Sequence, residues 1–102
     1  MPNTFTNSLV ANVGTTPVTT YSAPASTTSI MIGVNLSNTT ASQVKVDVQL
    51  NSIYLIKGVP IPANSALSPL DGKIVMKAGQ VLTVTSDTAS SSDVAVSVLE
   101  IS

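Results

Sequence analysis

The sequence contains no histidine, cysteine, tryptophan or arginine, and only 9% of its 102 residues are charged. Without histidine and cysteine, the chain lacks the commonest general base, the preferred zinc ligands and any means of forming a disulfide. Four lysines against five acidic residues give a net charge of −1, which leaves no basic patch for nucleic acid. These absences predict a protein that is not an enzyme and that uses no cofactor, metal, nucleic acid or small-molecule substrate.

Long apolar segments are missing as well. No run approaches the roughly 18 to 20 apolar residues of a membrane-spanning helix. The first ten residues have neither the basic nor the apolar region of a secretory signal peptide. We therefore expect a protein without membrane contact that is made in a cytosol and stays there or is assembled from there.

Serine, threonine and valine dominate what is present, with 15, 13 and 14 copies. Valine, isoleucine and threonine suit pleated, half-buried surfaces, so the composition predicts an all-β fold. The length predicts one domain, residues 1–102. A mean hydropathy of +0.41 with so few charges predicts apolar surface patches. We therefore expect the protein to be a subunit of an assembly. A homo-oligomer is the predicted form, with a trimer as the first hypothesis.

Two segments of the first half alternate apolar and polar residues: Ser29–Ser37 and Gln43–Asn51. Such alternation indicates strands that are buried on one side. The short polar loop between them predicts an antiparallel hairpin with apolar faces together. The side chains predicted to face inward are Ile30, Ile32, Val34, Leu36, Val44, Val46, Val48 and Leu50.

Two earlier strands are expected over Phe5–Asn12 and Pro17–Tyr21. Phe5, Leu9 and Val13 are the candidate core residues of the first of them. Pro17 has no N–H to donate, which favours an edge position or a strand start for the second.

The segment Ile53–Ile61 follows a tight turn at Asn51-Ser52, and Pro60 and Pro62 predict that it is an edge strand or leaves the sheet. Three further apolar runs then alternate with breaks at Asp71-Gly72, Ala78-Gly79 and Ser86–Asp93. The runs are Lys73–Lys77, Gln80–Thr85 and Asp93–Ile101, and they predict an antiparallel meander. In total, about seven to eight short strands predict an antiparallel β-sandwich or a jelly-roll-like fold.

The last strand is the candidate interaction site. Val98, Leu99 and Ile101 are all large and apolar, so both faces of the strand carry apolar groups. A strand with one face on its own core and one in water has no use for all three. We expect Leu99 and Ile101 to bury against a partner chain, with burial inside the same fold as the close alternative.

The acidic residues are scattered and form no evident catalytic pair. Asp71 precedes Gly72 and is typical of a turn, while Asp47 shares the polar face of a strand with Lys45.

Two weak motifs also occur in the chain. Asp87 and Asp93, in the loop Ser86–Asp93, could belong to a weak calcium site, although a solvated loop explains them better. Asn35-Leu36-Ser37 and Asn38-Thr39-Thr40 match the glycosylation pattern, which chance explains in so Ser/Thr/Asn-rich a chain without a signal peptide.

Several stretches carry a family resemblance. They are MPNTFTNSLVANVGTTPVTTYSAPASTTSIMIGVNLSNTT at the start and LDGKIVMKAGQVLTVTSDTASSSDVAVSVLEI, with its closing LEI, at the end. These stretches resemble small virion structural proteins of tailed bacteriophages, especially those of marine and cyanobacterial hosts. The likeness covers nearly the whole chain and is one of pattern rather than of catalytic motif. It implies a small, multicopy β protein of the particle, without catalysis, and it carries over no site residue.

The resemblance and the composition lead to the same expectation of a virion structural protein, assembled in the host cytoplasm and located in the virion. A capsid decoration (cement) protein, in contact with other virion proteins such as the major capsid protein, is the first hypothesis. A neck, tail or tail-fibre component is the runner-up. A receptor- or glycan-binding module is the alternative from another class, although three aromatic residues offer little to a sugar.

Overall fold

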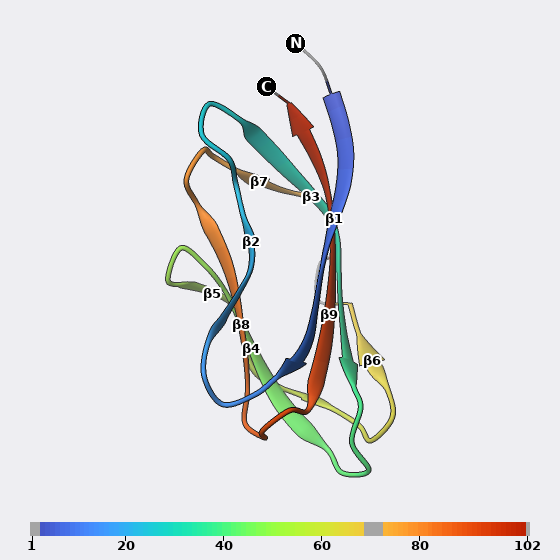
Figure 1. Cartoon of the computed structure of the whole chain (residues 1–102). Coiled ribbons are helices and arrows are strands. Elements are labelled where there is room, and N and C mark those ends of the chain that lie inside the picture. The colour runs from blue at the N-terminus through green and yellow to red at the C-terminus, as the bar shows by residue number, and fades with distance from the viewer. Residues whose placement is uncertain (1–2, 69–72, 102) are drawn as a thin grey trace.

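The computed structural model describes residues 3–68 and 73–101. Over these residues the chain forms nine β-strands, no helix and two antiparallel sheets packed face to face (Figure 1). The molecule is elongated, with extents of 45 × 21 × 21 Å. The all-β sandwich predicted from composition and periodicity is confirmed.

The two sheets draw their strands from the whole length of the chain. Sheet A has the order β1 (Asn3–Val13), β9 (Ser92–Ile101), β3 (Thr28–Asn38) and β6 (Ala66–Leu67), and β7 (Ile74–Met76) also pairs with β3. Sheet B has the order β2 (Val18–Ser22), β8 (Val81–Ser86), β4 (Val44–Leu50) and β5 (Ile53–Ile61).

The strand pairs are nested along the chain. The first strand pairs with the last, β2 with β8, β3 with β6 and β7, and β4 with β5. The chain is therefore one long antiparallel hairpin, and rolling it up brings β9 beside β3 and β8 beside β4. This is the connectivity of a jelly roll.

Two predicted pairings are wrong. The segments Ser29–Ser37 and Gln43–Asn51 are strands, but β3 lies in sheet A and β4 in sheet B, so they face each other across the core rather than forming a hairpin. The meander is also wrong, because β7, β8 and β9 alternate between the sheets. The Asp71-Gly72 break lies outside the described residues. At the next break, Gly79 has φ +84° in a turn, as predicted.

The core lies between the sheets and consists mostly of valine. Five of the eight side chains predicted to face inward are buried, namely Val34, Leu36, Val44, Val46 and Val48, and Leu50 packs against them. Ile30 and Ile32 are wrongly predicted, because a β-bulge between Met31 and Gly33 shifts the alternation of β3. Before the bulge Ser29 and Met31 point inward, so Ile30 and Ile32 lie on the outer face.

A second bulge accounts for the error in the first strand. Val13 is fully buried, but Phe5 and Leu9 are 74% and 71% exposed. All three residues have odd numbers, so they would lie on one face of the strand if its alternation were uninterrupted. The register shifts between Val10 and Val13, with Asn12 at φ +60°, so Val13 turns inward while Phe5 and Leu9 point outward.

The edge predicted from proline is confirmed, since β5 is the outermost strand of sheet B and Pro60 pairs with Lys45 of β4. The tight turn before it is confirmed as well. Asn51 and Ser52 both have positive φ, 51° and 70°, as a two-residue type I′ hairpin turn requires.

Candidate protein-binding surface

The outer face of sheet A, which points away from sheet B, carries a continuous row of apolar side chains. Phe5 of β1 lies opposite Leu99 of β9, Leu99 opposite Ile30 of β3, and Ile30 opposite Val75 of β7. We call these four residues the apolar row. Phe5 and Val75 are well exposed, while Leu99 and Ile30 between them are half-buried by their neighbours. Large apolar groups gathered on a surface typically mark a contact with another protein.

The structure separates the three residues predicted for the interaction site. Val98 is completely buried in the core, so no part of its side chain remains for a partner. Leu99 and Ile101 point to the opposite face, where both are partly exposed. Leu99 belongs to the apolar row, and Ile101 pairs with Asn3 and Thr28 in the next row towards the chain ends. Val98 is therefore a core residue, and the interface hypothesis is reduced to Leu99 and Ile101.

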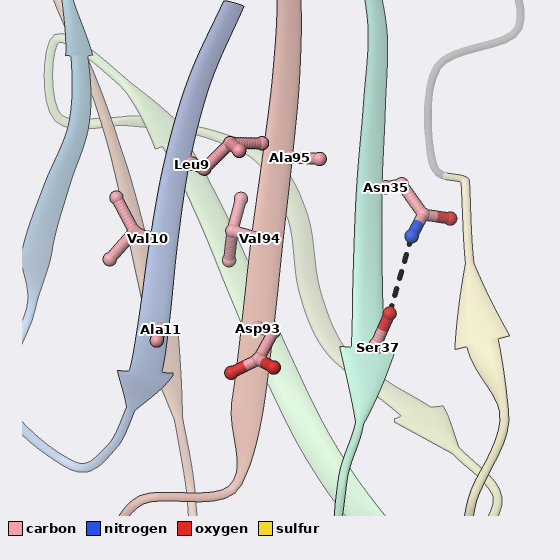
Figure 2. A pocket seen from close by; sticks show the side chains of 8 residues that line it. All are labelled: Leu9, Val10, Ala11, Asn35, Ser37, Asp93, Val94 and Ala95. Carbon is pink, nitrogen blue, oxygen red and sulfur yellow. Dashed lines mark hydrogen bonds between the residues drawn. The ribbon is translucent and has the colours of Figure 1, made fainter.

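A shallow hollow of about 310 Å³ lies on the same sheet, further from the chain termini. Figure 2 shows its lining, in which Leu9 lies over the gap between β1 and β9. The lining residues are Leu9, Val10, Ala11, Asn35, Ser37, Asp93, Val94 and Ala95. Five of the eight are apolar, and the polar ones are Asp93 on β9 and Asn35 and Ser37 on β3. Such a surface suits the side chains of another protein better than a small polar ligand.

The carboxylates near this end of the molecule are used within the fold. Asp93 accepts a hydrogen bond from the backbone N–H of Asn12, 3.0 Å away. Asp87 accepts from the N–H of Lys45 (3.1 Å) and from the hydroxyl of Thr88 (3.0 Å). Among the described residues, no three potential metal-ligating side chains of His, Cys, Asp or Glu come together.

Two further polar residues differ from what the sequence predicts. Asp47, predicted to be simply solvated on the polar face of its strand, accepts a hydrogen bond of 2.6 Å from the backbone N–H of Gly58. Gly58 has φ +63° and lies where β5 bulges. Asn38, a match to the glycosylation pattern, is only 3% exposed. Its side chain is therefore inaccessible for modification in the folded protein.

A second, smaller apolar patch lies on β5, at the edge of sheet B. Ile53 is 68% exposed and Tyr54 is 47% exposed. The ammonium of Lys57 lies 5.0 Å from the centre of the Tyr54 ring, within the range of a cation–π contact. A charged group therefore borders this patch, just as Lys73 and Lys77 flank Val75 at the end of the apolar row.

A buried polar cluster joins the two sheets near the chain termini. The phenol of Tyr21 on β2 donates to Glu100 of β9 (2.5 Å) and lies 2.8 Å from the hydroxyl of Ser29 on β3. Burial, and then the hydrogen bond to Glu100, raise the pKa of Tyr21 above its ordinary value of 10.0. The cluster holds the edge strand β2 against the end of sheet A that carries the apolar row.

This cluster predicts a stability loss in alkali. Because the pKa of Tyr21 is raised by folding, its stabilising contribution is complete below about pH 10 and is lost as the pH rises through the folded-state pKa. Tyr21→Phe is expected to lower the free energy of unfolding by about 1 to 2 kcal/mol at pH 8. It should also flatten the decline above pH 10, measured by urea unfolding at several pH values. The control Tyr54→Phe, at an exposed ring, should behave as the wild type; equal curves for the two variants would contradict the assignment.

Comparisons with known proteins leave the family open. No protein-family model matches the chain, and no curated protein matches it. Within residues 3–68 and 73–101, no helix has the length and hydropathy needed to cross a bilayer. The fold and the surface together thus define a small jelly-roll domain whose outer sheet face carries a row of apolar side chains.

Proposed function

We propose that this protein is a structural component of a tailed-bacteriophage virion, most specifically a capsid decoration protein that stabilises the shell by binding neighbouring capsid subunits. The observation that carries the proposal is the apolar row on the outer face of sheet A. In a monomer Phe5 and Val75 stay largely exposed to water, whereas a protein partner would bury them together with the exposed parts of Leu99 and Ile30.

Two further arguments support the proposal. The chain resembles small virion proteins of tailed phages over nearly its whole length, as set out above. Jelly rolls are also frequent in viral capsid proteins and lectins, which is support by analogy of fold alone. The apolar character of the row favours a protein contact over the lectin alternative, because sugar recognition depends on hydrogen-bonding groups as well as on aromatic faces.

Protein gels of purified virions test the place of the protein in the particle. A decoration protein should give a band whose molar intensity is comparable with that of the major capsid protein. A band at a small fraction of that intensity would favour the neck or tail alternative, and no band in washed particles would contradict a virion role.

A binding experiment tests the surface itself. The double variant carries Ile32→Lys and Val75→Lys. Ile32 is exposed beside the apolar row and Val75 belongs to it, so neither change disturbs the core. Because burying such side chains is worth about 1.5 to 3 kcal/mol each, we expect the double variant to bind undecorated capsids at least about tenfold more weakly. Sedimentation with capsids measures this.

The matched control is Ile53→Lys, at a still more exposed isoleucine on β5 of the opposite sheet. This variant should bind capsids as the wild type does. Weakened binding by Ile53→Lys with normal binding by the double variant would assign the contact to sheet B and overturn the proposed surface.

A further inference from the structure

We propose that β1 pairs with β1 of a second copy of this chain, antiparallel and about a twofold axis at Asn7, so that two copies of sheet A form one continuous sheet. The inference does not depend on the virion function proposed above. It rests on the edges of the two sheets, on the pattern of β1 and on the position of its bulge.

The outer edge of β1 is available for pairing. In the part of the chain that the structure describes, β1 pairs along one side with β9 and with no strand along the other. Its link to β2 is made by a side chain on the inner face, where the hydroxyl of Ser8 donates to the carbonyl of Thr20 at 2.5 Å. The free edge therefore presents unpaired backbone groups over a strand of 11 residues.

The other sheet edges carry features that prevent such pairing, whereas the first eight residues of β1 carry none. Lysines 73 and 77 flank the three residues of β7, while Lys57, Pro60 and the bulge at Gly58 interrupt β5. The strand β2 has only five residues and follows Pro17, and β6 has only two residues. Charges, prolines, bulges and short length are the usual protections of a sheet edge. Between Asn3 and Val10, β1 has no charge, no proline and no bulge.

The outward side chains of β1 are arranged symmetrically about Asn7. Phe5 and Leu9 stand two residues before and two residues after it, and they are the two most exposed large apolar side chains described. Antiparallel pairing about Asn7 places each Phe5 opposite Leu9 of the other copy and the two Asn7 amides opposite each other. Cross-strand neighbours at this distance contact directly, and an asparagine amide can both donate and accept.

The inner side chains and the bulge fit the same register. Thr6 comes to lie opposite Ser8 of the second copy, and Thr4 opposite Val10, so no charge is buried on either face. The regular part of β1 begins at Asn3 and ends at the bulge that follows Val10, which puts Asn7 near its centre. Because a strand paired with its own copy forms a closed, isologous contact, the assembly is a dimer and not the trimer expected from hydropathy.

Cysteine cross-linking tests the register. The chain has no cysteine, so Asn7→Cys introduces the only thiol. In this variant the Cα atoms of the two introduced cysteines would face each other across the axis, about 4.5 to 5.5 Å apart, which is within disulfide range. In Phe5→Cys the Cα atoms of the two introduced cysteines would lie about 13 Å apart along the strands, too far for a disulfide. Under mild oxidation, we expect a disulfide dimer from Asn7→Cys and at least about tenfold less from Phe5→Cys.

Light scattering after size exclusion gives a measurement independent of cross-linking. The wild type should elute as a dimer of the 10.4 kDa chain. Asn7→Lys, which sets two like charges against each other on the axis, should elute as a monomer that keeps the circular dichroism spectrum of the wild type, because Asn7 is exposed in the single chain. The control Ile53→Lys should remain a dimer.

A monomeric wild type at high concentration, a dimer of Asn7→Lys, or cross-linking of Phe5→Cys as efficient as that of Asn7→Cys would each overturn the proposal. The result is also distinguishable from that of the virion experiments. Capsid binding is tested through Ile32 on β3 and Val75 on β7, which are not residues of the edge strand β1, so either proposal can fail while the other holds.

Discussion

Val46→Asp is expected to abolish folding or to lower the free energy of unfolding by more than about 4 kcal/mol. Val46 is completely buried in the centre of sheet B, where it lies between Val59 of β5 and Ser86 of β8. An aspartate there would place a charge among apolar side chains without a partner, which is among the most costly single changes a core can suffer.

The neighbouring Lys45→Ala is the matched control for this change. Lys45 lies on the exposed face of the same strand, so its loss should shift the free energy of unfolding by only about 0.5 kcal/mol. Thermal melts monitored by circular dichroism compare the two variants. Similar melting temperatures would mean that the register of β4 is wrong.

Asn38→Ala should be the most damaging change to a polar residue, with an expected loss of about 3 kcal/mol. The buried amide nitrogen donates to the carbonyls of Ser42 (2.8 Å), Ile61 (3.0 Å) and Pro62 (3.1 Å). Its oxygen accepts from the N–H and the hydroxyl of Thr40. One side chain thus fixes the loop from β3 to β4 against the end of β5, and alanine would leave several of these groups without partners.

Asn35→Ala, on the same strand, provides the comparison. Asn35 is exposed and donates only one long hydrogen bond, of 3.3 Å, to Ser37. We expect a change below about 0.5 kcal/mol, measured by urea denaturation beside Asn38→Ala. If the two alanine variants lost equal stability, the role assigned to Asn38 would be wrong.

The sequence predicted the fold class well because alternation reports burial directly. In β4 the valines at 44, 46 and 48 alternate with polar residues and are all buried. The prediction failed where a strand contains a bulge, because one inserted residue reverses the face of everything that follows. Asn12, at φ +60°, marks one such bulge, and an asparagine before Val13-Gly14 was its only sequence signal.

The pairing of the strands could not be predicted in the same way. A short loop is compatible both with a hairpin in one sheet and with a crossing to the opposite sheet, and the loop after β3 makes the crossing. The sequence did identify the strand of the candidate surface through Leu99 and Ile101. It missed Phe5 and Val75, because large apolar side chains were assumed to face the core.

The nested order of the strand pairs has a consequence for how the chain folds. β4 and β5 are joined by a two-residue turn and can meet early, whereas the pairing of β1 with β9 joins the two ends of the chain. The entropy lost on closing a loop grows with its length, so each outer pair depends on the inner pairs having formed first. Folding should therefore proceed from the centre of the sequence outwards and be slow for a domain of this size. Until β1 docks as the final strand, the edge of β9 stays open to any other strand in the cell, including the newly made β1 of a neighbouring chain.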